Sequence, residues 1–131
     1  MKKDIKFPQI ENVFVTVVKD SDEDLWKVFL LNRHHKKIEN VMVSSKGYGE
    51  KDGEKQETST LRHVIPFVEP GEYALIEPIH EQVFHLNNEY WVSFFIDGQL
   101  YDKKYIFVPE TIIQDNLSYI EELGLEGVLH Q

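Results

Sequence analysis

The chain has 131 residues and no cysteine, so we expect one domain of ordinary size, without disulfides, thiolate nucleophiles or cysteine-ligated zinc. The net charge of −9 repels phosphate backbones, so no nucleic-acid partner is expected. No run of about 18 apolar residues occurs, and Asp4, Lys6 and Pro8 interrupt the place where a signal peptide has its apolar core. We therefore expect a cytoplasmic protein with no membrane partner.

The first part of the chain predicts three strands. Val13–Val18 is rich in β-branched residues, and an acidic turn is expected at residues 20–24. Leu25–Leu31 is apolar on both faces, which indicates a central strand. After a polar connection at residues 32–37, alternation resumes in Ile38–Ser45.

The middle of the chain predicts a loop and two further strands. Lys46–Glu57 contains three glycines and no apolar period, which indicates an exposed, mobile loop. Thr58–Phe67 alternates again, Pro70-Gly71 is a turn signal, and Tyr73–Glu77 forms a short strand after it. Pro78–Asn88 has no regular pattern.

Asn88–Val108 contains the strongest local signal, two apolar and aromatic runs that flank Asp97-Gly98. This dipeptide between such runs predicts a two-residue β-hairpin, in which Ile96 lies opposite Gln99 and Tyr90 opposite Tyr105. One face of the hairpin is expected to meet the core, namely Tyr90, Val92, Phe94, Ile96, Tyr101, Tyr105 and Phe107. The other face carries Trp91, Ser93, Phe95, Leu100, Asp102 and Lys104.

The segment after Pro109 predicts a short helix at residues 111–123. Its apolar residues lie at helical spacing, and Gly124 occupies the position of a C-terminal cap. These residues are Ile113, Leu117, Ile120 and Leu123. We expect the helix to cover either the open end of the sheets or the Trp91 face of the hairpin.

About seven short strands with regular turn signals favour an all-β chain, with two antiparallel sheets packed as a sandwich in a single domain over residues 1–131. Glu39–Val41, Glu69–Glu72 and Glu89–Val92 together resemble the middle strands of immunoglobulin-like and fibronectin-type-III-like bacterial domains. This resemblance implies an immunoglobulin-like fold, in which Tyr90 could form a tyrosine corner.

The whole chain also resembles a family of short, uncharacterised bacterial proteins, some of which carry the label phenylalanyl-tRNA synthetase alpha subunit. The resemblance rests on Ser45–Gly49, Thr58–His63, Leu86–Trp91 and Tyr101–Lys104. A class II synthetase core is far longer than this chain, so the label's catalytic activity is not implied. An RNA-related accessory role is a third possibility, which the charge of −9 disfavours.

Two groups of residues are candidate binding sites. Trp91, Phe95 and Leu100 form an apolar group that either the C-terminal helix or another strand covers, or that meets a partner. The second group is Tyr48, Arg62 and His63, beside hydroxyl-bearing residues that could hold a phosphate or a carboxylate.

No metal or cofactor is expected. Asp20, Asp22 and Asp24 alternate as in a calcium loop, but Leu25 and Leu31 occupy the positions that need glycine and glutamate. The adjacent histidines at residues 34 and 35 would point to opposite sides of an extended strand.

These patterns predict a non-catalytic cytoplasmic protein-interaction or structural domain, not an enzyme, whose partner is another protein or a second copy in a homodimer. The alternative is a small-ligand or anion-binding domain, with or without catalysis, that uses Tyr48, Arg62 and His63.

Overall fold

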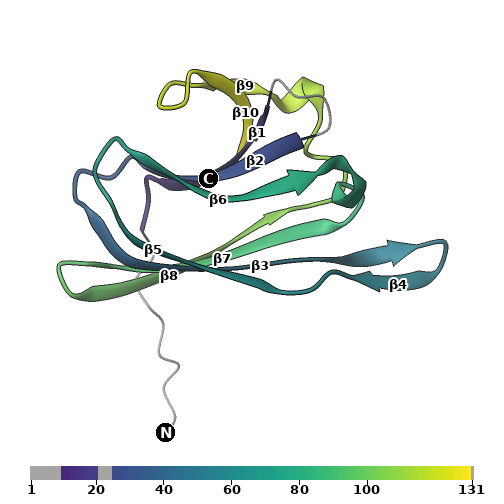
Figure 1. Ribbon diagram of the computed structural model, residues 1–131, viewed down its shortest axis with the longest axis horizontal. Coiled ribbons are helices and arrows are strands. Elements are labelled where there is room, and N and C mark those ends of the chain that lie inside the picture. The colour runs from purple at the N-terminus through teal and green to yellow at the C-terminus, as the bar shows by residue number, and fades with distance from the viewer. Residues whose placement is uncertain (1–9, 21–24, 131) are drawn as a thin grey trace, which may run out of the picture.

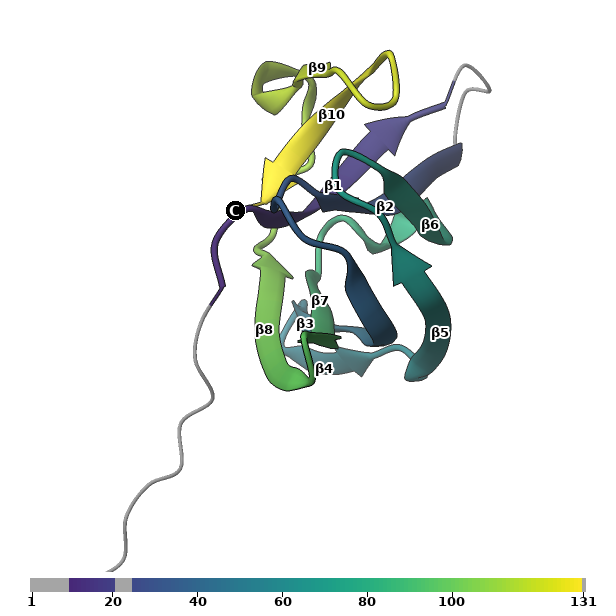
Figure 2. The same ribbon diagram turned by 90° about the vertical axis from the view of Figure 1, so that its left-hand side faces the viewer.

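The computed structural model describes residues 10–20 and 25–130, which form two stacked antiparallel sheets (Figures 1 and 2). Sheet A contains, in spatial order, β6 (Tyr73–His80), β2 (Leu25–Asn32), β1 (Val13–Lys19), β10 (Leu125–His130) and β9 (Ser118–Ile120). Sheet B contains β4 (Glu54–Glu57), β3 (Ile38–Lys51), β7 (Asn87–Ile96) and β8 (Gln99–Phe107), and β5 (Leu61–Val68) also pairs with β3. Two short 3₁₀ turns lie at Glu81–Val83 and Gln114–Asn116. The expected mainly-β chain with two antiparallel sheets is confirmed.

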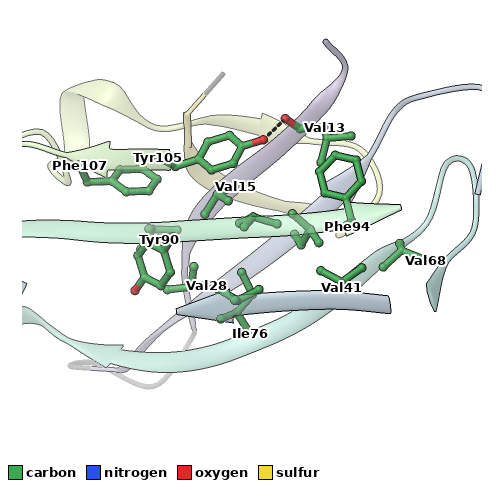
Figure 3. Close-up of a cluster of buried hydrophobic side chains, with 14 of the residues drawn as sticks. Val13, Val15, Val28, Val41, Val68, Ile76, Tyr90, Phe94, Tyr105 and Phe107 are labelled. Carbon is green, nitrogen blue, oxygen red and sulfur yellow. Dashed lines mark hydrogen bonds between the residues drawn. The ribbon is translucent and has the colours of Figure 1, made fainter. Parts of the chain in front are cut away.

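The core lies between the two sheets, where alternate residues of both inner faces meet (Figure 3). Val15 and Val28 of sheet A and Val41 of sheet B are fully buried. The hydroxyl of Tyr105 on β8 donates a hydrogen bond of 2.5 Å to the carbonyl of Val13 on β1. Burial raises the pKa of this phenol, which keeps it protonated as the donor. This bond ties sheet B to sheet A.

The hairpin predicted around Asp97-Gly98 is confirmed in detail. Its strands are β7 and β8, with Ile96 opposite Gln99 and Tyr90 opposite Tyr105. The φ angles of Asp97 and Gly98 are 49° and 77°, as a turn that matches the twist of the flanking strands requires. The expected central position of β2 is also confirmed, since it lies between β6 and β1.

The prediction of an exposed, mobile loop at Lys46–Glu57 is wrong. Here β3 continues to Lys51, turns at Asp52-Gly53, and pairs back with β4, so that Tyr48 lies opposite Glu57. This hairpin extends beyond the rest of sheet B (Figure 1). It has no core to face, so its strands carry no apolar alternation that the sequence could reveal.

The prediction of a short helix at residues 111–123 is also wrong. This segment contains a 3₁₀ turn and the short strand β9, and β10 follows it. The apparent helical spacing of Ile120 and Leu123 comes from a tight turn, in which the amides of Leu123 and Gly124 both donate to the Ile120 carbonyl. Gly124 has a φ of 63° in this turn.

The C-terminal segment that ends in β9 packs on the outer side of β1 and β2 of sheet A, and it does not cover the outer side of sheet B. Ile120 is buried with Val18, Phe29 and Leu31 of β1 and β2. Figure 1 shows β9 on the side of sheet A that faces away from sheet B. The expectation that a C-terminal helix covers the face of Trp91 is therefore wrong.

Two predictions fall wholly or largely outside the described residues. These are the interrupted N-terminal segment and the acidic turn at residues 20–24, of which only Asp20 is described. Its carboxylate lies 3.0 Å from the ammonium of Lys27. Within the described ranges, no helix is long and apolar enough to cross a membrane.

Candidate functional site

The outer face of sheet B, which points away from sheet A, carries an uncovered apolar group. Because side chains alternate along a strand, residues on either side of the buried Val41, Val43, Val92 and Phe94 project outward. The outward-facing residues of β5, β3, β7 and β8 in this region are Arg62, Val64, Met42, Ser44, Trp91, Ser93, Phe95, Leu100 and Asp102. We call this set the outer face.

The outer face is hollowed because two small residues lie at its centre. Strand β3 pairs with β7 so that Ser44 lies opposite Trp91 and Met42 opposite Ser93. The serines leave a hollow of about 470 Å³ between the larger side chains. This volume lies within the roughly 300–1,000 Å³ of typical ligand pockets.

The walls of the hollow are apolar and in contact with solvent. Val64 is 76% exposed, Met42 52% and Trp91 47%, while Phe95 and Leu100 are half-buried. Contiguous exposed apolar surface of this kind marks binding sites in soluble proteins. Trp and Arg are also the residues most enriched at the energetic centres of interfaces.

The indole of Trp91 is held in place by charged neighbours on β8. Its Nε1 donates a hydrogen bond of 3.3 Å to a carboxylate oxygen of Asp102. The ammonium of Lys104 lies 4.7 Å from the ring centroid, a favourable cation–π distance. The same ammonium lies 4.0 Å from the carboxylate of Glu89, which directs it away from the hollow.

Arg62 stands at the opposite side of the hollow, on β5. Within the described ranges no carboxylate forms an ion pair with its exposed guanidinium. The other arginine of the chain, Arg33, is held by Glu122, with bonds of 2.8 and 3.0 Å. Arg62 is therefore available to an anionic group that approaches the outer face.

Tyr48 lies elsewhere on sheet B, near the β3–β4 hairpin. Its hydroxyl donates a hydrogen bond of 3.3 Å to Glu89, and the ammonium of Lys46 lies 4.0 Å from the same carboxylate. Burial, and then the charge of Glu89, raise the pKa of the Tyr48 phenol. These residues line a second hollow of about 450 Å³, distinct from the one beside Trp91.

His63 contributes to the lining of the first hollow, but its ring is bonded between the sheets. Its Nε2 lies 2.7 Å from a carboxylate oxygen of Glu77 on β6, and the Ser45 hydroxyl donates to the same oxygen at 2.6 Å. Because Ser45 donates to the carboxylate and not to the imidazole, this group lacks the nucleophile–base pair of acyl transfer. It links β3 and β5 of sheet B to β6 of sheet A.

The carboxylate of Glu77 also accepts a hydrogen bond of 3.3 Å from the hydroxyl of Tyr90. Burial, together with the charge of Glu77, raises the pKa of Tyr90 well above its ordinary value. A tyrosine corner would instead donate to a backbone carbonyl a few residues upstream. The prediction that Tyr90 forms a tyrosine corner is therefore wrong.

Histidines and acids do not converge on a metal site in the part of the chain that the structure describes. The rings of His34 and His35 are stacked, with centroids 4.3 Å apart, because this connection bends instead of extending. The expectation that they point to opposite sides is wrong. Burial, followed by the charges of His35 and Lys36, lowers the pKa of His34.

The structure thus places Trp91, Phe95, Leu100 and Arg62 around one hollow, adds His63 to its lining, and places Tyr48 elsewhere. Sequence reasoning placed Ser93 and Asp102 on the face of Trp91 without naming them as site residues. It missed Met42, Ser44 and Val64. Their only signal was their outward phase in the predicted strands, since the pairing of β3 with β5 and β7 joins segments far apart in the chain. No protein-family model matches the chain, and a search of curated proteins finds no match either.

Proposed function

We propose that this protein is a non-catalytic interaction domain that binds another protein, or a second copy of itself, through the outer face of sheet B. The observation that carries the proposal is the apolar hollow centred on Trp91, which nothing in the described chain covers. An apolar centre with Trp91, bordered by Arg62 and Asp102, is the composition of an interface with a polar rim.

The experiment compares the wild type with Trp91→Ala as baits in an affinity pull-down, after circular dichroism has established that both are folded. Tyr119→Ala is the matched control, because Tyr119 is an aromatic residue on β9 of sheet A and is 65% exposed. We expect a partner that the wild type and the control retain and that Trp91→Ala loses. Equal retention by all three baits would contradict the proposal.

A second candidate function is the binding of a small anionic ligand. One observation favours it, namely that Arg62 has no carboxylate partner among the described residues and borders a hollow of about 470 Å³. Arg62 is the residue on which this candidate function rests, because Tyr48 lines the other hollow and the ring of His63 is bonded to Glu77.

A thermal-shift screen of small carboxylates and phosphates tests this second function. A ligand at 100 times its Kd adds about 2.7 kcal/mol to the free energy of unfolding. The stabilisation should disappear in Arg62→Ala. A screen without a stabilising compound, or a stabilisation that Arg62→Ala retains, would speak against it.

We also infer that the sandwich is immunoglobulin-like. In support, β1, β2 and β6 share one sheet and β3, β7 and β8 the other, as strands A, B and E and strands C, F and G do in immunoglobulin domains. An experimental structure with another strand order would contradict this.

Three further expectations stay predictions. Cell fractionation tests the cytoplasmic location, and comparison with an experimental structure of a family member tests the family resemblance. A gel shift with tRNA tests the absence of a nucleic-acid partner.

A further inference from the structure

We propose that the occupant of the outer face is a second copy of this chain, bound face to face about a two-fold axis that runs parallel to the strands between β3 and β7. The inference rests on the proposed function, of which it names the partner. It is argued from the arrangement of large and small residues and of opposite charges on the face.

Large and small side chains alternate diagonally at the centre of the face. In one row Ser44 on β3 is small and Trp91 on β7 is large, and in the next row Met42 on β3 is large and Ser93 on β7 is small. Each row therefore presents one projection and one depression. Two such faces interlock only if the projections of one meet the depressions of the other.

The proposed two-fold axis brings about this match. It places β7 of one copy over β3 of the other and keeps each row over the same row. Trp91 then lies over Ser44 of the second copy, and Met42 over Ser93 of the second copy. Stacked sheets lie about 10 Å apart, a spacing at which side chains of the two faces interdigitate. Every large residue at the centre thus fills a depression.

The charges on the two sides of the hollow follow the same symmetry. Arg62 belongs to β5 and Asp102 to β8, which flank β3 and β7 on opposite sides. The axis places β5 of one copy over β8 of the other. Lys104 lies in the same row as Arg62, so the axis places Lys104 of one copy over Arg62 of the other. The ammonium of Lys104 is directed toward Glu89 and the Trp91 ring and so does not face that arginine.

Asp102 is accordingly the charged group of β8 that faces the hollow. It lies two residues from Lys104, a distance of about 7 Å along the strand that an arginine side chain can span. Two ion pairs form in the dimer, each between Arg62 of one copy and Asp102 of the other.

The width of the face favours a second copy over a small ligand. From β5 to β8 there are three strand spacings, about 14 Å, so a small ion such as phosphate or acetate does not reach both Arg62 and Asp102. A second copy satisfies both groups at once. The charge of −9 on each chain opposes association, and salt of about 0.15 M screens that repulsion to a Debye length of about 8 Å.

The test is sedimentation equilibrium of the full chain in salt of about 0.15 M, over protein concentrations from about 1 µM to 1 mM. We expect the wild type to form dimers. Trp91→Ser removes a projection, and Ser44→Trp fills the depression that should receive it. Each variant should raise the dimer Kd by about 30-fold or more, the range of an interface hot spot. The double variant exchanges the two residues and should recover most of the affinity.

The charged pair provides a second test, which leaves the four central residues Ser44, Trp91, Met42 and Ser93 unchanged. Asp102→Arg also removes the acceptor of the Trp91 indole hydrogen bond, so the decisive result is the recovery in a mixture. Arg62→Glu and Asp102→Arg each place like charges against one another in the homodimer, so each variant alone should be monomeric. Mixed in equal amounts, the two variants form a heterodimer in which both pairs carry opposite charges. Recovery of dimer in the mixture is expected only where residue 62 of one copy meets residue 102 of the other, as it does in this face-to-face arrangement.

A wild type that stays monomeric throughout would overturn the inference, as would a dimer that survives all four single variants or a charge-variant mixture that stays monomeric. These results differ from failure of the proposed function. A monomer that still captures another protein through Trp91 refutes the second copy alone, whereas equal capture by wild type, Trp91→Ala and the Tyr119→Ala control refutes the proposed function.

Discussion

Gly127→Ala tests the placement of β10 beside β1. Gly127 lies in β10, opposite Val18 of β1. A Cβ added to this glycine would lie 2.7 Å from the Thr16 hydroxyl oxygen, 2.7 Å from a methyl of Val18 and 3.0 Å from the carbonyl oxygen of Val17. The two distances of 2.7 Å are too short for carbon and the third is tight, so the neighbours must move.

The neighbours of Gly127 have little freedom to move. Thr16 and Val18 are fully buried, and the Thr16 hydroxyl donates a hydrogen bond of 3.0 Å to the Val128 carbonyl. Overpacking of this kind costs about 1–3 kcal/mol. The gain from a less flexible unfolded chain offsets about 0.4–1 kcal/mol of that cost. We expect a net loss of about 1–2 kcal/mol in the free energy of unfolding.

Equilibrium urea unfolding, followed by tryptophan fluorescence, measures this loss. Gly49→Ala is the matched control, because Gly49 also lies in a strand and its added Cβ would meet only Leu86, 3.2 Å from a side-chain methyl and 3.8 Å from the Cα. We expect the control to stay within about 0.5 kcal/mol of the wild type. If Gly127→Ala matched the control, β10 would not pack against β1, and the pairing of these two strands would be refuted.

Two further predictions concern side chains that join distant segments. Tyr105→Phe leaves the Val13 carbonyl without its 2.5 Å donor and should lose about 1–3 kcal/mol in urea unfolding, whereas Tyr119→Phe at an exposed site should lose almost nothing. The hydrogen bond from Arg33 lowers the pKa of Glu122 below its usual 4.5, so the ionised carboxylate stabilises the folded state above that pH. As the pH falls through the lowered pKa, the wild type should lose this advantage over Glu122→Gln, and unfolding at several pH values should show the two stabilities converge. A constant difference would contradict this account.

The features that sequence predicted well are those with local causes. Asp97-Gly98 specifies the turn by its backbone conformation, and once the turn is fixed, the register of β7 against β8 follows residue by residue. The same register placed Trp91, Phe95 and Leu100 on one face. Turn chemistry and alternation were sufficient because both act within a few residues.

The features that sequence missed depend on contacts between distant segments or lie outside the core. The strand β10 is defined by pairing with β1, more than 100 residues away, while the helical spacing of Ile120 and Leu123 fits a tight turn equally well. The β3–β4 hairpin lies beyond the core, and therefore its polar strands show no alternation. Arg62 and Trp91 share the outer face because β3 pairs with both β5 and β7, a pairing that no local pattern specifies.

The exposure of Trp91 makes its role in folding separable from its role in binding. Truncation of a buried aromatic residue to alanine costs about 3–5 kcal/mol, and the 47% exposure of Trp91 means that roughly half of that burial is absent in the free protein. Trp91→Ala should therefore lose about 1–2 kcal/mol of stability, less than the 5–15 kcal/mol that keeps a typical domain folded. At the centre of an interface, the same truncation raises Kd by about 30-fold or more. Urea unfolding of Trp91→Ala beside its dimer Kd measures both effects. A loss above about 3 kcal/mol would identify Trp91 as a core residue and remove the basis for an interaction surface on sheet B.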